Sequence, residues 1–170
     1  PHSAGSMPGP ACYGRNGPAT LTDCEVVLGR LVGFPSLCGP NHDQPLDLMA
    51  AQQALNTLDP SRPVEEVASD FKEVAAEEMA SAILRHAANL GVDPAGHALV
   101  VFGGAGAAHA CDIAQRLSIT KVVIPILAGV FSAVGIGSTT RRDEVSRMVV
   151  NNDIETALQL CIEDLPWQGS

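Results

Sequence analysis

Residues 98–126 have the sequence ALVVFGGAGAAHACDIAQRLSITKVVIPI, in which two apolar runs enclose a glycine turn and a helical segment. The run at 98–102 is short and apolar, as expected of a fully buried strand, and residues 121–126 predict a second strand. Residues 107–117 between them return to helical spacing. A strand, a glycine turn, a helix and a second strand predict a βαβ unit with a right-handed crossover, and therefore an α/β fold.

The region around this unit carries little charge. Only Asp112, Arg116 and Lys121 are charged among residues 98–137, so we expect the buried centre of the protein here. The small-residue segment 129–137, GVFSAVGIG, is consistent with the start of a tightly packed helix. We expect Ser132 within it to be a buried hydroxyl that bonds to the backbone rather than a nucleophile, because no GxSxG motif is present.

Three helices are predicted outside this region, two before it in the sequence and one after it. The clearest follows Pro63 and stops near Gly91, with acidic residues in its first turn and a solvent-facing Glu77-Glu78 pair. A second helix spans about residues 46–58, and an amphipathic one runs from Asp153 to Leu165. Their expected buried positions are Leu46, Met49, Ala50, Ala54 and Leu58; Val64, Val67, Phe71, Val74, Ala75, Met79, Ala82, Ile83 and Leu90; and Ile154, Leu158, Cys161, Ile162 and Leu165.

Residues 1–45 differ from the rest of the chain because half of its glycines and prolines fall there. Such a stretch predicts a loop-rich arm that lies on another surface. Within it, residues 20–31 predict a short helix capped by Thr22 or Asp23, with Val26, Val27, Leu28 and Leu31 facing inward. The expected organisation is an arm at 1–45, an α/β lobe at 46–150 and a C-terminal amphipathic helix at 151–170.

The composition excludes several classes of function. The 170 residues carry ten basic and nineteen acidic side chains, a formal charge of −9. That balance argues against binding to nucleic acid or to an anionic membrane. No apolar stretch reaches the ~20 residues of a membrane span, and the N-terminus lacks a signal-peptide pattern. The five cysteines are scattered without a CxxC pair, so we expect reduced, mostly buried thiols in a cytoplasmic protein.

The candidate site is the turn formed by Gly103, Gly104, Ala105 and Gly106. Glycines after a strand allow a phosphate or nucleotide to approach the backbone closely, but they also allow a helix to pack tightly on a sheet. Spacing alone leaves both interpretations open, because the turn matches neither a P-loop nor a dinucleotide fingerprint. His109 follows the turn and could hydrogen-bond a ligand or be a core histidine. Cys111 points elsewhere around the helix, so no metal site is predicted.

Two stretches together resemble a known family. Residues 1–31, PHSAGSMPGPACYGRNGPATLTDCEVVLGRL, are similar to SAGADPGPACYGRGG and the following TVTDANLVLGRL of the hydantoinase A, 5-oxoprolinase and ketone carboxylase family. Residues 101–110, VFGGAGAAHA, resemble FGGAGPLHA in the ATP-dependent subunits of the same family. The order of the intervening segments also matches, and the resemblance covers about residues 1–145.

The resemblance implies one lobe of an actin-like, sugar-kinase-like ATPase fold with a loop-rich N-terminal arm. In that fold the turn at residues 103–106, with His109 beside it, is similar to the adenosine motif that holds the base and ribose of ATP. The family uses ATP and Mg²⁺ to activate a carbonyl or bicarbonate, and then carboxylates a ketone or opens a cyclic amide. The implied partners are larger subunits of the same family in a hetero-oligomer resembling acetophenone carboxylase.

The sequence departs from the family pattern at three positions. Members usually carry Asp at the position of Met7, Ala at that of Cys24 and Pro at that of Ala107. The family's GTxxTD-type phosphate turn is absent, so we expect half of an ATPase cleft that is inactive alone. Three interpretations remain open: a natural small subunit, which Pro1 favours as the residue after Met removal; a piece of a hydantoinase or oxoprolinase; and a structural subunit without a working nucleotide site.

Overall fold

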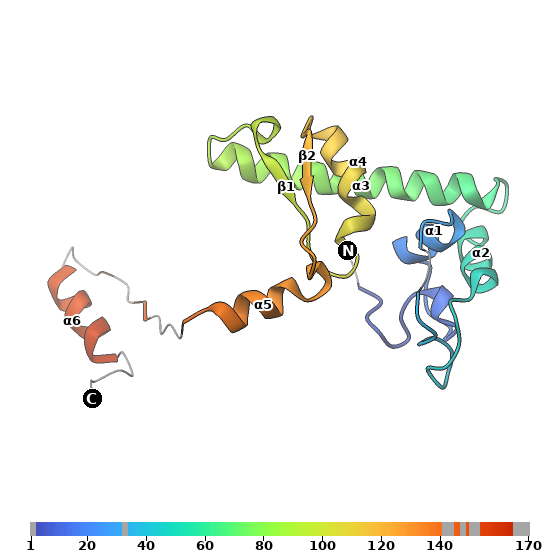
Figure 1. Ribbon diagram of the computed structural model, residues 1–170, viewed down its shortest axis with the longest axis horizontal. Coiled ribbons are helices and arrows are strands. Elements are labelled where there is room, and N and C mark those ends of the chain that lie inside the picture. The colour runs from blue at the N-terminus through green and yellow to red at the C-terminus, as the bar shows by residue number, and fades with distance from the viewer. Residues whose placement is uncertain (1–2, 32–33, 141–144, 147–148, 150–153, 165–170) are drawn as a thin grey trace. The chain divides into compact units, whose positions relative to one another are not determined.

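The computed structural model describes residues 3–31, 34–140, 145–146, 149 and 154–164. Its contacts divide the chain into two units, Pro1–Phe131 and Ser132–Ser170. Figure 1 labels the main helices and strands. In chain order the elements are η1 (Ala11–Tyr13), α1 (Leu21–Val27), α2 (Leu48–Asn56), α3 (Val64–Asn89), η2 (Pro94–Gly96), β1 (Ala98–Val100), η3 (Gly106–His109), α4 (Ala110–Arg116), β2 (Lys121–Val123), η4 (Ala128–Val130), α5 (Phe131–Ser138) and α6 (Ile154–Asp164).

β1 and β2 form a two-stranded parallel sheet, which confirms the predicted βαβ connection and the α/β class. Leu99 pairs with Val122 at the centre of the register. These two side chains pack against the helices, whereas Val100 and Val123 are 51% and 42% exposed. The expectation of a fully buried strand at 98–102 is therefore wrong for this chain. Parallel sheets are normally covered on both faces, and the described residues cover one.

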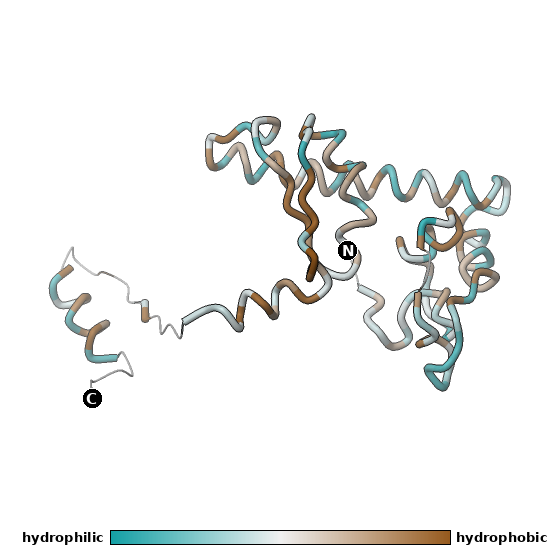
Figure 2. The backbone as a smooth tube through the Cα atoms, viewed as in Figure 1, coloured by the Kyte–Doolittle hydropathy of each residue, from teal (hydrophilic) through white to brown (hydrophobic). Residues whose placement is uncertain are grey.

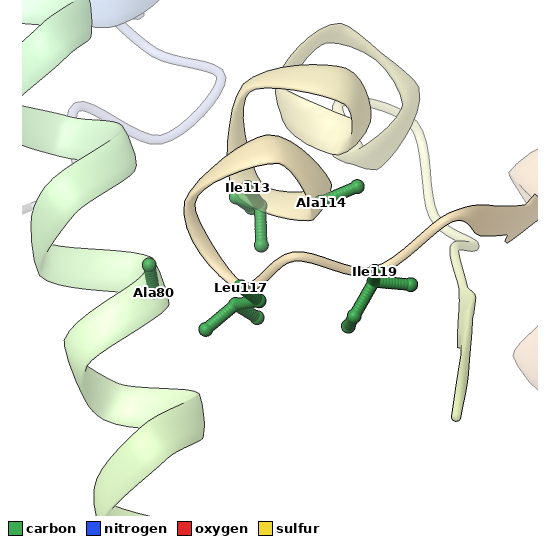
Figure 3. Packing of buried hydrophobic residues seen from close by; sticks show 5 residues of the cluster. All are labelled: Ala80, Ile113, Ala114, Leu117 and Ile119. Carbon is green, nitrogen blue, oxygen red and sulfur yellow. The ribbon is translucent and has the colours of Figure 1, made fainter. Parts of the chain in front are cut away.

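The covered face of the sheet belongs to an apolar cluster between α3 and α4. Figure 3 shows its five buried side chains on α3, on α4 and on the segment that leads into β2. The small Ala80 on α3 allows α4 to approach closely, and Leu99 and Val122 complete the packing. The members of this cluster are Ala80, Ile113, Ala114, Leu117 and Ile119.

A second buried cluster joins α1, α2 and α3. Cys24, Leu55 and Ala68 form its centre, with one residue from each helix. Among these helices, α3 closely follows its predicted span between Pro63 and Gly91. Its exposed Glu77 and Glu78 confirm the solvent-facing pair, and Glu77 also forms an ion pair with Arg116 at 3.4 Å.

The predicted buried stripe is wrong on α2 and only partly right on α3. On α2, Ala51 and Leu55 are buried, whereas the expected Met49 is 79% exposed; the expected Leu58, just after the helix, is 54% exposed. On α3, the expected Phe71 and Val74 are exposed. The expected Val67 is buried, and Val64, Met79 and Ile83 pack against the two buried clusters, as predicted. Helix periodicity limits which residues share a face but does not say which face meets a neighbour. The residues that α3 buries are Val67, Ala68, Lys72, Ala76 and Ala80.

The N-terminal arm is organised by one buried carboxylate. Asp23 accepts hydrogen bonds from the Cys12 amide at 2.6 Å, the Ala11 amide at 3.3 Å and the Thr20 amide at 2.7 Å. The Thr20 hydroxyl also donates to it at 2.8 Å. The bond from the Thr20 amide is one half of a capping box at the start of α1, in which the Thr20 side chain accepts from the helix backbone in return. The cap residue is thus Thr20, not Thr22 or Asp23, because Asp23 occupies the third helical position. The interior of α1 is also more polar than predicted: Asp23, Cys24 and Glu25 are buried, and Val26, Val27, Leu28 and Leu31 are half-buried.

Three of the five cysteines are buried, and all five are free thiols, as predicted. Cys12, Cys24 and Cys38 lie inside the first unit. Burial raises the pKa of Cys24 to about 11 and raises that of Cys12 further. These thiols therefore stay protonated and act as small apolar side chains in the packing of the arm.

The segment after β2 is apolar but exposed. Figure 2 shows hydrophobic residues along β1, β2 and α5. Ile126 is fully exposed, and every residue from 129 to 140 is exposed, Ser132 included. The prediction of a buried centre is therefore right for the cluster on α4 and the segment that leads into β2, and wrong for the residues after β2. The predictions of tight packing at 129–137 and of a buried Ser132 hydroxyl are wrong, because the described chain brings no second layer onto these residues.

In the second unit, α6 confirms the predicted amphipathic helix. Ile154, Leu158 and Ile162 are spaced four residues apart and are more than half exposed. Asp153 and Leu165, expected at its two ends, lie outside the described residues. Across the part of the chain that the structure describes, no helix combines the length and apolar character that crossing a membrane requires.

Candidate functional site

The glycine turn follows β1 directly and is held at its first residue. The amide of Val101 donates to the carbonyl of Val123 at 2.9 Å, which extends the strand pairing by one bond. Gly103 then adopts a φ of +95°, a conformation that favours glycine, and its amide donates to the carbonyl of Ala128 at 2.7 Å. The chain is thus turned away from the sheet and fixed there.

The glycines of the turn differ in what surrounds them. A Cβ atom on Gly106 would lie 2.9 Å from Cγ1 of Val101, so this glycine lets the following helix pack on the strand. A Cβ atom on Gly104 would meet no atom within 4 Å. The packing interpretation therefore accounts for Gly106, and a local backbone requirement accounts for Gly103. Neither accounts for Gly104.

The middle of the turn offers unused hydrogen-bond donors. Residues 102–105 are exposed, and the amides of Gly104 and Ala105 donate to no group in the described part of the chain. Exposed amides next to glycine, with no side chain in front of them, can donate to a ligand that lies against the backbone.

An exposed aromatic pair borders the turn. The rings of Phe102 and Phe131 lie 5.4 Å apart between centroids and are tilted by 53°. Their side chains are 49% and 38% exposed. Phe102 immediately precedes Gly103, so an exposed aromatic side chain stands at the start of the turn that carries the free amides. The sequence reasoning missed this pair, because residues 29 positions apart are brought together only by the fold.

His109 ends η3 and is half-buried beside the turn. Its Nδ1 atom is buried and has no hydrogen-bond partner among the described residues. Burial lowers the pKa of His109, and the Lys72 ammonium lowers it further, whereas Glu25 and Asp112 act in the opposite direction. The imidazole is therefore neutral at pH 7, a form that can donate from one nitrogen and accept at the other.

A buried charge cluster lies behind the turn, and sequence reasoning did not find it. Lys72 on α3 forms an ion pair with Glu25 on α1, and both side chains are more than nine-tenths buried. The Lys72 ammonium also donates to the carbonyl of Ala108 at 3.3 Å and lies 3.8 Å from Asp112. One sequence signal could have indicated the buried lysine: Lys72 lies four residues from Ala68 and from Ala76, on the face of α3 that is buried.

The site does not fit a divalent metal by itself. Magnesium prefers several carboxylate or water oxygens in octahedral geometry. Asp112, the carboxylate on α4 nearest in sequence to the turn, is engaged by Lys72 and Arg30. Among the residues that the structure describes, no group of His, Cys, Asp and Glu side chains could hold a metal ion.

The comparisons with known proteins match most of the chain. The family model for hydantoinase/oxoprolinase covers residues 1–145. The chain is 40% identical over 153 residues to 5-oxoprolinase 1 of Arabidopsis thaliana, and the match covers 81% of this chain and 12% of that protein. It is 37% identical over 139 residues to the acetophenone carboxylase gamma subunit of Aromatoleum aromaticum, covering 79% of this chain and 18% of the subunit.

A solved structure shares the fold. The ATP-dependent caprolactamase from Pseudomonas jessenii aligns with a TM-score of 0.67 and 33% identity, over 79% of this chain and 20% of that chain. In each comparison this chain spans no more than about a fifth of the length of its relative. Since the family model covers residues 1–145 of the 170, the chain belongs to the hydantoinase/oxoprolinase family.

Proposed function

We propose that this chain supplies the adenosine side of an ATP site, as one lobe of an actin-like ATPase fold. The observation that carries the proposal is the exposed turn after β1, where Gly104 and Ala105 keep their amides free and Gly104 has open space around it. Backbone at Gly103, Gly104, Ala105 and Gly106 would hold the ribose and base. A relative whose structure shares this fold is an ATP-dependent caprolactamase.

Two side chains add to such a site. The exposed face of Phe102 offers a surface on which a purine ring can stack, and such contacts are worth about 1–3 kcal/mol per base. The neutral imidazole of His109 can donate or accept a hydrogen bond at the ribose or the base without placing a positive charge there. Neither contact requires a metal ion.

The phosphate side of the cleft would come from a larger polypeptide of the same family. The free energy of ATP cleavage is coupled to chemistry only when Mg²⁺ and donors flank the phosphates, and the described residues offer no magnesium site. Val100 and Val123 leave the outer face of the sheet uncovered, and parallel sheets are stable when both faces are buried. We therefore infer that the chain works in a hetero-oligomer, and is inactive alone.

Two reactions are candidates for the complete assembly. One is ATP-dependent carboxylation of a ketone, supported by 37% identity to the acetophenone carboxylase gamma subunit, which also supports a multi-subunit enzyme. The other is ATP-dependent opening of a cyclic amide, supported by 40% identity to a 5-oxoprolinase and by the fold shared with a caprolactamase. Both need ATP to activate an unreactive carbonyl or bicarbonate, so the proposed role of this lobe is the same in either.

The test is amide hydrogen exchange at the turn, with and without ATP and Mg²⁺, on the chain together with the proteins that co-purify with it. We expect ATP to slow exchange over residues 103–108, because the nucleotide would cover the free amides of Gly104 and Ala105. Phe102→Ala should reduce this protection. Phe71→Ala is the matched control, since Phe71 is 43% exposed on α3 and lies apart from the turn.

Exchange that is the same with and without ATP would overturn the proposal and favour the structural-subunit interpretation. Native mass spectrometry of the same sample tests the partner. A complex with a larger chain of the family supports the assembly, whereas a 17.6 kDa species alone contradicts it.

A further inference from the structure

The segment from Gly103 to Ala108, which contains the glycine turn and the start of η3, is anchored at both ends and free in the middle. At its start, the Gly103 amide donates to the Ala128 carbonyl at 2.7 Å. At its end, the Ala108 carbonyl accepts from the Lys72 ammonium at 3.3 Å. The unused amides of Gly104 and Ala105 lie between these two anchors. The second anchor is unlike the first, because it is a charged side chain from another helix rather than a backbone group.

A lysine at position 72 needs an explanation beyond packing. Ala68 and Ala76, one turn before and after it, are fully buried, so an apolar side chain would suit this face of α3. Replacing a buried ion pair with apolar residues of similar volume is often neutral or stabilising. Lys72 nevertheless has only 4% of its side chain exposed, with the carboxylate of Glu25 against it. Its charge therefore has a use that packing does not supply.

The contacts of Lys72 indicate that use. An ammonium has three donors, and here it meets Glu25 on α1, the Ala108 carbonyl and, at 3.8 Å, Asp112 on α4. Only one of these, Ala108, belongs to the segment of the proposed nucleotide site. The Ala108 carbonyl is part of the peptide group that leads into His109, so fixing this carbonyl orients the peptide plane from which the His109 residue extends.

We propose that Lys72, held by Glu25, is a positioning residue that fixes the end of the glycine turn through the Ala108 carbonyl and so couples the N-terminal arm to nucleotide binding. This inference rests on the proposed function for its nucleotide part only. The other part of the inference, that Lys72 orders the turn, does not depend on nucleotide binding and can be tested on the chain without nucleotide. The arm is then a support for the site, since α1 carries the carboxylate that keeps Lys72 in place.

The test must separate positioning from general stability. Lys72→Met alone would leave the buried Glu25 carboxylate without its cation, so a loss of folding would hide any effect on the turn. The informative variant is therefore the double substitution Glu25→Met/Lys72→Met. This double substitution removes both charges together and keeps two long helix-forming side chains, so neither partner is left as an unpaired buried charge. We expect its thermal midpoint to stay close to that of the wild type. Glu73→Gln is the matched control, because it removes an ion pair between α3 and α4 that does not involve the turn.

The first readout is amide hydrogen exchange without nucleotide. The amides of Ala108 and Ala110 are protected by the carbonyls of Ala105 and Ala107. In the double variant we expect their exchange to become about tenfold faster, as follows from losing a hydrogen bond to a charged group. In Glu73→Gln their exchange should match the wild type. Equal exchange in all three proteins would overturn the inference, since a merely structural ion pair predicts that outcome.

The second readout is the affinity for ATP of the complex that contains each variant. We expect the double variant to bind about tenfold more weakly, and Glu73→Gln to bind as the wild type does. Faster exchange with unchanged affinity would overturn the coupling to nucleotide. If the wild type itself binds no ATP, the proposed function fails. The exchange experiment still decides whether Lys72 orders the turn.

Discussion

The N-terminal arm and the glycine turn are both rich in glycine, but they use their backbone donors in opposite ways. In the arm, the Asp23 carboxylate accepts from the amides of Ala11, Cys12 and Thr20, so the loop is closed on itself. In the turn, the amides of Gly104 and Ala105 remain free in the described chain. The difference shows that glycine content does not identify a ligand loop; what identifies one is whether its donors are already used.

The largest effect is expected at Asp23. Asp23→Asn keeps the shape of the side chain but replaces an oxygen with an amide that faces backbone donors. We expect a loss of about 3–5 kcal/mol in the free energy of unfolding, because charge-assisted hydrogen bonds are lost and donors are left buried. Urea unfolding measures it. Asp59→Asn is the control: Asp59 is half-buried at the surface and, among the described residues, its carboxylate accepts from the amide and hydroxyl of nearby Ser61, so its effect should stay within about 1 kcal/mol. Similar losses in the two variants would contradict a closed, self-supporting arm.

A smaller effect is expected at Gly106. Gly106→Ala places a methyl group 2.9 Å from Cγ1 of Val101, so the valine side chain or the turn must shift. We expect a loss of about 1–2 kcal/mol in the free energy of unfolding, as for other overpacked sites. Thermal or urea unfolding checks this value. A variant as stable as the wild type would show that the helix does not rest on the strand at this glycine.

Gly104→Ala tests the other glycine of the turn, the one that packing does not require. Its Cβ atom meets open space, so we expect the free energy of unfolding to change by no more than about 0.5 kcal/mol. If the turn holds a nucleotide, the added methyl group should nevertheless weaken the protection that ATP gives to residues 103–108. Unchanged protection by ATP in this variant would place the ligand away from Gly104.

The smallest effect is a pH dependence at His109. Its pKa in the folded chain lies below the ordinary value of 6.5, so the unfolded chain takes up the proton first as the pH falls. The stability contributed by the neutral imidazole is therefore complete above that value, and is lost as the pH falls from 6.5 through the lower folded pKa. Thermal midpoints measured between about pH 5 and 8 should show this slope. His109→Gln should flatten it, and an identical slope in the variant would assign the effect to another group.

Part of the fold and of the site could be predicted from the sequence. The strands at 98–100 and 121–123, the long helix after Pro63 and the turn at 103–106 follow from apolar periodicity and glycine placement. The interpretation of Asp23 as a capping residue was right in kind, although the cap itself is Thr20. The family also followed from two motifs, and the comparisons confirm it. The nucleotide role of residues 103–106 and His109 stays a prediction.

The sequence by itself determined the local elements, because hydrogen bonds within a helix or turn and the spacing of apolar residues are properties of neighbouring positions. Only the tertiary structure decided which glycine is needed for packing, which face of α2 is buried, and that Lys72 meets Glu25 and the Ala108 carbonyl across 47 and 36 positions. Those outcomes depend on contacts between distant segments. The pattern of residues within one segment does not indicate which other segment it will contact in the fold. It also does not indicate whether its backbone donors will be used in that contact.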